Sequence, residues 1–193
     1  MVAPEWARVL DGLHIGDHVI LLYNDFSGLE PPVTRFMMQG LHANELVVAL
    51  LPIQEMDHWR GILDHVLTNA GSGPEAGSVQ IIPILPSRLT EDTGPLDIVS
   101  IVRRVLKDAL AEGRTGVRVV GRLAPALFDK GFERNAVAIE KFAAQQRFPM
   151  KVMCLYDATQ FAKAPAAFVS EVVAAHTHSI AHVSEDVYLV EAV

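Results

Sequence analysis

The sequence has little positive charge, a single cysteine and no long apolar run, and each shortage excludes a class of protein. Its formal net charge is -7, so we expect no basic face for direct nucleic-acid binding. One cysteine, Cys154, excludes an internal disulfide and a multi-cysteine metal site. The longest apolar runs are about six to eight residues, against the roughly 20 that a membrane-spanning helix needs. We therefore expect no membrane segment.

The N-terminus lacks a basic region followed by an apolar stretch, so we expect no signal peptide. A reducing, cytoplasmic location fits the single cysteine. Half of the 193 residues are hydrophobic and 20% are charged, a balance that favours a folded protein over a disordered one. The length suits one domain, which we expect to span residues 1–193.

Strand-like and helix-like patterns alternate along the chain. Strand-like segments occupy residues 17–25, 46–51, 79–85, 117–121 and 150–157, and the early ones contain continuous apolar runs, which are typical of strands buried on both faces. Apolar residues at helical spacing occupy 4–13, 33–41, 54–69, 95–112, 130–147 and 165–176. Pro83 places the third strand at an edge, and two short strands at 179–183 and 187–190 predict a terminal hairpin. The pattern predicts a doubly wound α/β fold with a mainly parallel sheet and a C-terminal β-hairpin.

Residues 24–32 stand where a nucleotide-binding protein of this class carries its phosphate loop. Such a loop needs glycines, a lysine and a hydroxyl group. This segment has Ser27-Gly28 but no lysine, and Pro31-Pro32 stiffen its end. The fourth strand ends in Gly121-Arg122, without an acid to hold magnesium. We expect no ATP hydrolysis, and we interpret residues 24–32 as a polar turn.

Polar side chains follow the carboxyl ends of three predicted strands, where ligands bind in open parallel sheets. They are Tyr23, Asn24 and Asp25, then Arg122, then Tyr156 and Asp157. Together they predict a polar crevice in which Arg122 pairs with an anionic group and the tyrosines stack or donate hydrogen bonds. The alternative is that Asn24, Asp25 and Asp157 only cap helices and turns, which their positions also suit.

Histidine offers a second candidate site. His176 and His178 form the tightest pair, with His182 four residues beyond. Zinc sites use imidazoles, but this spacing matches no standard site, and the alternative is a solvated helix end. We assign no metal, and His176, His178 and His182 remain the candidates should one bind.

Support for catalysis is weak. No Gly-x-Ser-x-Gly motif occurs. Cys154 lies in an apolar strand, which indicates a core thiol, and a solvated helix face is the default interpretation of Glu140. We assign no catalytic residue and no cofactor.

Several short motifs, in their order and spacing, resemble the MEDS domain, the methanogen and methylotroph sensory domain. The resemblance spans about residues 14–183, and Glu140 falls where that family places an acid. The motifs are Gly16-Asp17-His18-Val19-Ile20-Leu21-Leu22-Tyr23, Met38-Gln39-Gly40-Leu41, Glu45-Leu46-Val47-Val48, Val117-Arg118-Val119-Val120-Gly121-Arg122, and Cys154-Leu155-Tyr156-Asp157 with Phe161 and His176.

The resemblance implies a RecA- or KaiC-like core that has lost its phosphate loop. It also implies sensing of small hydrocarbon derivatives rather than catalysis. Gly121-Arg122-Leu123 stands where many relatives have Gly-Glu-Met, which puts an acid's role there in doubt. We expect this chain to lack the helix-turn-helix or kinase module often fused to such domains. A signal would therefore pass to a separate kinase or transcription regulator, or through self-association.

The leading hypothesis is a non-catalytic cytoplasmic sensor of a small molecule. Its expected ligand-binding residues are those of the polar crevice, with two histidines nearby: Tyr23, Asn24, Asp25, Arg122, Tyr156, Asp157, His18 and His176. Two alternatives remain. One is an assembly module derived from a RecA-like ATPase, which pairs through the apolar terminal hairpin. The other is a metal-dependent enzyme that uses His176, His178 and His182.

Overall fold

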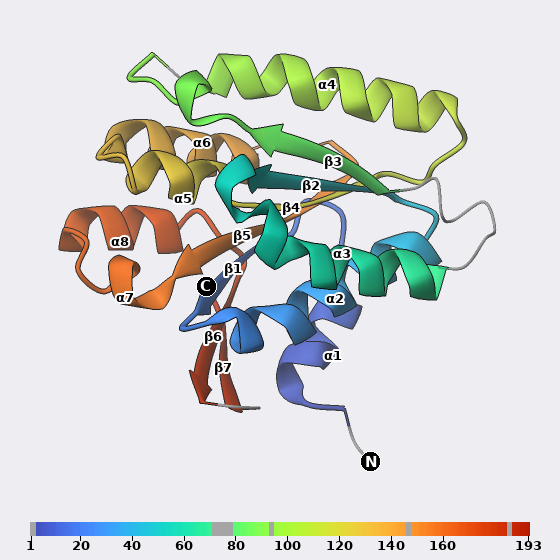
Figure 1. Ribbon diagram of the computed structural model, residues 1–193, viewed down its shortest axis with the longest axis horizontal. Coiled ribbons are helices and arrows are strands. Elements are labelled where there is room, and N and C mark those ends of the chain that lie inside the picture. Colours follow the sequence, from blue (N-terminus) through green and yellow to red (C-terminus); the bar gives the residue numbers. More distant parts are fainter. Residues whose placement is uncertain (1–2, 71–78, 93–94, 146–147, 185–186) are drawn as a thin grey trace.

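The structure is a computed structural model that describes residues 3–70, 79–92, 95–145, 148–184 and 187–193. Within these residues one sheet has the strand order β3-β2-β4-β5-β1-β6-β7 (Figure 1). Neighbouring strands run parallel except β6 and β7, which form an antiparallel hairpin. The strands are β1 (His18–Tyr23), β2 (Leu46–Pro52), β3 (Val79–Ile84), β4 (Val117–Gly121), β5 (Met150–Asp157), β6 (His178–Ser184) and β7 (Val187–Ala192).

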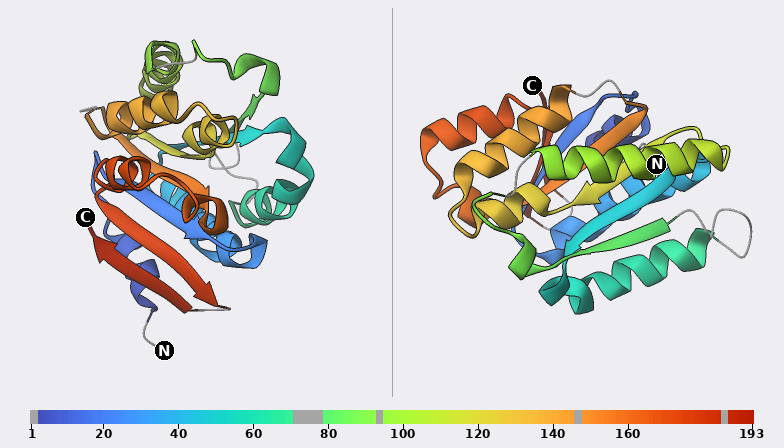
Figure 2. Two further views of the ribbon diagram at one scale, coloured as in Figure 1. Left: turned by 90° about the vertical axis from the view of Figure 1, so that its left-hand side faces the viewer. Right: turned by 90° about the horizontal axis from the view of Figure 1, so that it is seen from above.

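Helices cover both faces of the sheet, as the two views of Figure 2 show. One face carries α1 (Glu5–Asp11), α2 (Phe26–His42) and α3 (Met56–Ala70), with the short helix η1 (Ile53–Glu55) before α3. The other carries α4 (Pro95–Ala111), α5 (Leu123–Phe128), α6 (Glu133–Gln145), α7 (Ala158–Phe161) and α8 (Ala166–Val173). A further short helix, η3 (Pro86–Arg88), follows β3. The predicted α/β architecture is confirmed.

Alternation along the central strands explains why the interior strands are apolar over most of their length. In β1, Val19 and Leu21 face α2, whereas Ile20 faces α5 and α8. All three side chains are fully buried, so each strand contributes to two cores. β3 forms the edge of the sheet that Pro83 predicts.

The prediction of a polar turn over residues 24–32 is wrong, because α2 begins at Phe26. Asp25 caps this helix by accepting a hydrogen bond from the Gly28 amide at 3.0 Å. Pro32 has no N–H to donate to the Gly28 carbonyl one turn earlier. The Tyr188 hydroxyl donates to that carbonyl instead, at 3.0 Å. The terminal hairpin thus satisfies a backbone group that the proline leaves open.

A buried ionic network stabilises the amino end of the sheet. Glu45 accepts a hydrogen bond from Arg118 on one carboxylate oxygen and from Lys151 on the other, each at 2.6 Å. All three residues are buried. Because an unpaired charge at such a site is costly, the network fixes how β2, β4 and β5 align. Among the described residues, no helix combines the length and apolar character needed to cross a bilayer.

Candidate functional site

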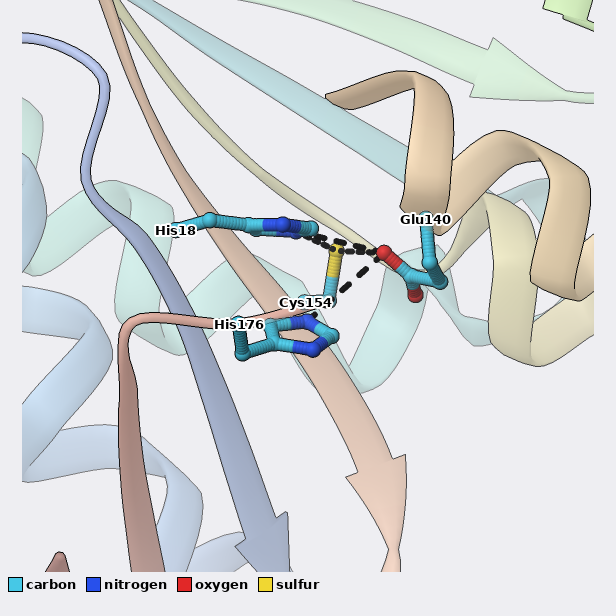
Figure 3. A group of neighbouring side chains, drawn as sticks. All are labelled: His18, Glu140, Cys154 and His176. Atoms are coloured by element: carbon cyan, nitrogen blue, oxygen red, sulfur yellow. Dashed lines mark hydrogen bonds and ion pairs between the residues drawn. The ribbon is translucent and has the colours of Figure 1, made fainter. Parts of the chain in front are cut away.

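Four polar side chains converge beneath α6 and α8, inside the second face of the sheet (Figure 3). His18 begins β1, Cys154 lies in β5, Glu140 projects from α6, and His176 follows α8. Glu140 is fully buried, and His18 and His176 are almost so. We call these four residues the His–Glu–Cys cluster.

The four side chains approach one another closely. Glu140 Oε2 lies 3.2 Å from His18 Nε2 and 3.6 Å from His176 Nε2. Cys154 Sγ donates to the same carboxylate oxygen at 3.1 Å and lies 3.3 Å from His18 Nε2. The two imidazole rings pack with centroids 3.8 Å apart. One ligand-type atom from each residue thus lies within 4.8 Å of all the others.

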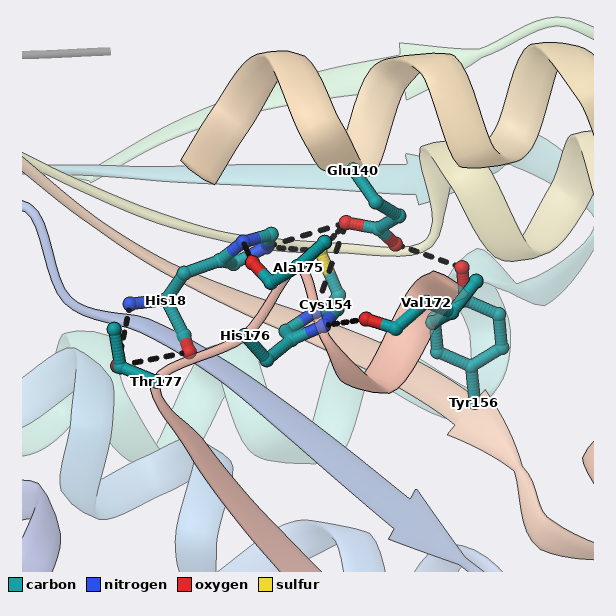
Figure 4. Close-up of polar contacts among 8 residues, drawn as sticks. All are labelled: His18, Glu140, Cys154, Tyr156, Val172, Ala175, His176 and Thr177. Carbon is teal, nitrogen blue, oxygen red and sulfur yellow. Dashed lines mark hydrogen bonds and ion pairs between the residues drawn. The ribbon is translucent and has the colours of Figure 1, made fainter. Parts of the chain in front are cut away.

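Both histidines are oriented by hydrogen bonds to backbone carbonyls (Figure 4). His18 Nδ1 lies 2.9 Å from the Ala175 carbonyl, and His176 Nδ1 lies 2.6 Å from that of Val172. A carbonyl only accepts, so each Nδ1 carries a proton. Each Nε2 therefore points into the cluster, and among the described residues His176 Nε2 has no hydrogen-bond partner.

Glu140 is held as a carboxylate in this buried position. Its second oxygen accepts a hydrogen bond from the Tyr156 hydroxyl at 2.7 Å. Burial opposes its ionisation, but the charge of His176 and the hydrogen bonds from His18 and Tyr156 outweigh burial and lower the pKa of Glu140 to about 2. The cluster thus contains a buried negative charge.

Two other groups of the cluster, His176 and Cys154, are held neutral. Burial, and then the charge of His18, lower the pKa of His176 to about 4, against the opposing effect of Glu140. Burial, and then the Glu140 charge, raise the pKa of the Cys154 thiol well above its ordinary range. A neutral imidazole and a protonated thiol beside a carboxylate do not form an activated nucleophile.

A small apolar cavity adjoins the cluster, between β4, β5 and α6. Its volume is about 60 Å³. Glu140 and Cys154 form its polar end, and the rest of the lining is apolar, including Val119, Val152, Ile139 and Ala143. Gly121 also lines it. We call this space the α6 cavity.

The crevice at the carboxyl ends of the strands is present, but Arg122 is already paired there. Its guanidinium forms ion pairs with Glu55 and, at 3.0 Å, with Asp129, and it lies 6.0 Å from the centre of the Tyr23 ring. The crevice holds about 580 Å³ and is lined by Arg122 and Lys163 but also by Asp129, Glu133 and Asp157. Because carboxylates outnumber cations, an anionic ligand is disfavoured.

The predicted site residues therefore separate into distinct places. Tyr23 and Tyr156 point to opposite faces of the sheet, because Tyr156 aligns with Leu22 of β1 rather than with Tyr23. Of the eight, Arg122 and Asp157 line the crevice, and Tyr23 contacts it only through its ring near Arg122. His18, His176 and Tyr156 lie at the buried cluster.

The other polar residues at the strand ends either cap helices or join neighbouring strands. Asp25 caps α2, and Asp157 caps α7 by accepting from the Gln160 amide at 2.9 Å. A hydrogen bond from the Ser27 hydroxyl lowers the pKa of Asp25. Asn24 donates to the His182 carbonyl at 2.9 Å and so joins β1 to β6. The capping alternative thus describes both aspartates.

The predicted histidine group does not assemble. His176 lies inside the second face of the sheet, whereas His182 packs against Tyr188 with ring centroids 5.2 Å apart. His178 contacts the Thr177 hydroxyl at an exposed position. The partners of His176 are instead His18, Glu140 and Cys154, far away in the sequence.

Two residues of the cluster escaped the sequence prediction. The solvated helix face expected for Glu140 is wrong, since its exposure is 0%. The sequence did contain a signal for the burial of Glu140. Residues 136, 139, 140 and 143 share one helical face, so this acid lies among apolar neighbours. Cys154 packs against the core, as expected, and the sequence did not show that its Sγ also belongs to the polar cluster.

Comparisons with known proteins agree with this architecture. Residues 17–177 match the family model described as MEDS, MEthanogen/methylotroph, DcmR Sensory domain. No curated protein matches the chain. A solved structure from Pyrococcus horikoshii OT3, titled only as a structural study, is similar with a TM-score of 0.65 at 11% identity, covering 97% of this chain and 91% of that chain. At that identity the likeness shows the fold alone.

Proposed function

This chain belongs to the MEDS family of sensory domains, and we propose that it is a non-catalytic sensor of a small, weakly polar molecule bound in the α6 cavity. The family match supports a sensory role and includes every residue of the His–Glu–Cys cluster. The ligand class and its site are the proposal.

The α6 cavity is the observation that carries the proposal. Its 60 Å³ equals about two water volumes, so it suits a molecule of a few heavy atoms. The apolar lining favours a hydrocarbon derivative over a sugar, a nucleotide or an ion. Glu140 and Cys154 at one end can orient a polar or polarisable atom of such a molecule. The small hydrocarbon derivatives that the resemblance to this family implies as ligands suit a cavity of this size.

The crevice at the carboxyl ends is the less favourable place for the ligand. Arg122, which was expected to bind an anion, has two carboxylate partners from its own chain. A ligand there would have to displace one of them. The proposal therefore keeps His18, His176 and Tyr156 of the expected residues, and it adds Glu140 and Cys154.

Signalling from such a site would pass through a partner. We propose that residues 1–193 act as one MEDS unit with a RecA-like core, which reports to a separate kinase or transcription regulator in the cytoplasm. The α6 cavity touches α4, α5 and α6 as well as the sheet, so a bound ligand would change the packing of helices on one face.

Unfolding experiments test the proposal. Purified protein is unfolded by heat with one- to three-carbon halides and alcohols, dichloromethane first. A ligand at one hundred times its Kd stabilises the folded state by about 2.7 kcal/mol. The Ala143→Val variant, whose side chain occupies the cavity, should lose this shift, and Ala144→Val on the exposed side of α6 should keep it. If no compound stabilises the protein, or the two variants respond alike, the proposal fails.

A protein-interaction module is the second candidate, and the β7 edge strand supports it. Val187, Leu189 and Val193 are 53%, 61% and 52% exposed, and β7 ends the sheet. Exposed apolar edge strands favour pairing with another strand. Light scattering distinguishes the candidates: a stable oligomer broken by Leu189→Lys supports the module, and a monomer at all concentrations opposes it.

A further inference from the structure

We propose that the His–Glu–Cys cluster is a tetrahedral metal site for a divalent transition metal, with zinc as the expected ion. The ligand atoms are Nε2 of His18, Nε2 of His176, one Glu140 oxygen and Cys154 Sγ. The inference does not require a ligand in the α6 cavity, but the two sites share Glu140 and Cys154, so a bound ion would take over the side chains that form the polar end of that cavity.

The spacing of the four atoms fits a tetrahedron around zinc. Bonds of about 2.0–2.1 Å to nitrogen and oxygen and about 2.3 Å to sulfur place neighbouring ligands roughly 3.3–3.6 Å apart. Of the six separations between these atoms, four are 3.1, 3.2, 3.3 and 3.6 Å, and the other two are within 4.8 Å. The ion therefore fits at the centre with small side-chain adjustments.

The surrounding hydrogen bonds favour the same interpretation. Histidines that bind metals usually donate their other ring N–H to a carbonyl or carboxylate, which fixes the tautomer. His18 does so to Ala175, and His176 does so to Val172 (Figure 4). The carboxylate is fixed likewise by the hydrogen bond from Tyr156.

A partner is also needed for a buried polar atom. His176 Nε2 is inaccessible to solvent and has no hydrogen-bond partner among the described residues. It points toward Glu140 Oε2, 3.6 Å away, as Figure 3 shows. A neutral imidazole cannot donate from that nitrogen while Nδ1 holds the proton. A metal ion at the centre would use this lone pair.

The donor set indicates the kind of ion. Two imidazoles, a thiolate and a carboxylate suit a borderline ion that accepts tetrahedral geometry, and they do not suit magnesium or calcium. With the thiol ionised, the two negative ligands balance the charge of a divalent ion, so the buried site becomes neutral. Four protein ligands complete a structural zinc shell and leave no open position for a substrate.

The positions of the ligands suggest what the ion would do. His18 begins β1, Glu140 lies on α6, Cys154 lies on β5, and His176 joins α8 to the terminal hairpin. Bonds to one ion would tie these four elements together. The metal would thus stabilise the junction from which β6 and β7 extend.

Cobalt and zinc titrations of untagged, chelator-treated protein test the site. We expect one equivalent of Co²⁺ to give the intense visible bands of a tetrahedral ion and a thiolate-to-cobalt charge-transfer band, both removed by one equivalent of Zn²⁺. Cys154→Ser should abolish the charge-transfer band. His65→Ala, at an exposed histidine of α3, is the matched control and should bind as wild type.

A variant of Tyr156, which orients Glu140, separates metal binding from folding. Tyr156→Phe keeps all four ligands but removes the hydrogen bond to Glu140, and it should weaken zinc binding about 10- to 100-fold in a chelator competition. Circular dichroism of each metal-free variant checks that it folds. The inference is overturned if wild-type protein gives no charge-transfer band, or if Cys154→Ser binds cobalt with an unchanged spectrum and affinity.

Discussion

Filling the α6 cavity with a side chain should stabilise the protein, because the cavity costs packing energy. Ala143 lines the cavity and Ala144 is exposed on the same helix. A cavity costs about 24 cal/mol for each Å³, so recovering 60 Å³ gives about 1.4 kcal/mol. Valine in a helix costs about 0.6 kcal/mol relative to alanine. Ala143→Val should gain about 0.8 kcal/mol, and Ala144→Val should lose about 0.6 kcal/mol.

Urea unfolding at equilibrium measures this difference. The two variants have the same helix cost, so the contrast between them, about 1.4 kcal/mol, reports the cavity alone. Equal m-values would show that both unfold from comparable states. If Ala143→Val is destabilised as much as Ala144→Val or more, no fillable space adjoins α6, and the proposed ligand site is refuted.

Three further predictions concern the framework around the site. Glu45→Gln leaves two buried cations without a charged partner and should lower the free energy of unfolding in urea by about 3–5 kcal/mol. The control Glu171→Gln, at a half-exposed ion pair, should lower it by under about 1 kcal/mol. Equal losses in the two variants would contradict the buried network. Burial raises the pKa of Tyr23 from 10.0 to about 12. Its contribution to the free energy of unfolding, on the order of 2 kcal/mol, is therefore complete below pH 10 and is lost as the pH rises toward 12. Tyr23→Phe should flatten this loss between pH 10 and 12, and an unchanged profile would refute the assignment to Tyr23. Tyr188→Phe removes the donor to the Gly28 carbonyl and should lower the stability by about 1 kcal/mol. Thermal unfolding, with Val187→Ala as the control, measures this loss. No loss would mean that water replaces the hydroxyl.

The fold was predictable because burial leaves a direct record in the sequence. Strands covered on both faces are mostly apolar, so their positions follow from composition, and Pro83 marks β3 as an edge. The residues at which helices begin were harder to predict. The Pro31-Pro32 pair resembles a turn, yet it lies inside α2 because the Tyr188 hydroxyl satisfies a freed carbonyl. Pro125 lies within α5, a helix that the sequence did not predict.

The candidate site was only partly predictable, since it depends on which face each side chain occupies. The rule about strand ends brought Tyr23 and Tyr156 together, but the register of β1 and β5 separates them. His18 and His176 were expected as neighbours of the site, and their rings do pack together. Glu140 connects them from a helix, and no local spacing joins α6 to the ends of β1 and α8.

An NMR titration with dichloromethane tests the central claim, that a small weakly polar ligand binds in the α6 cavity. Amide shifts of ¹⁵N-labelled protein would be followed as the compound is added. The account predicts saturable changes centred on Gly121, Ile139 and Ala143, which line the cavity. Changes centred instead on Asp129 and Lys163 would place binding at the crevice, and the absence of saturable changes would show no binding; either result would contradict the claim.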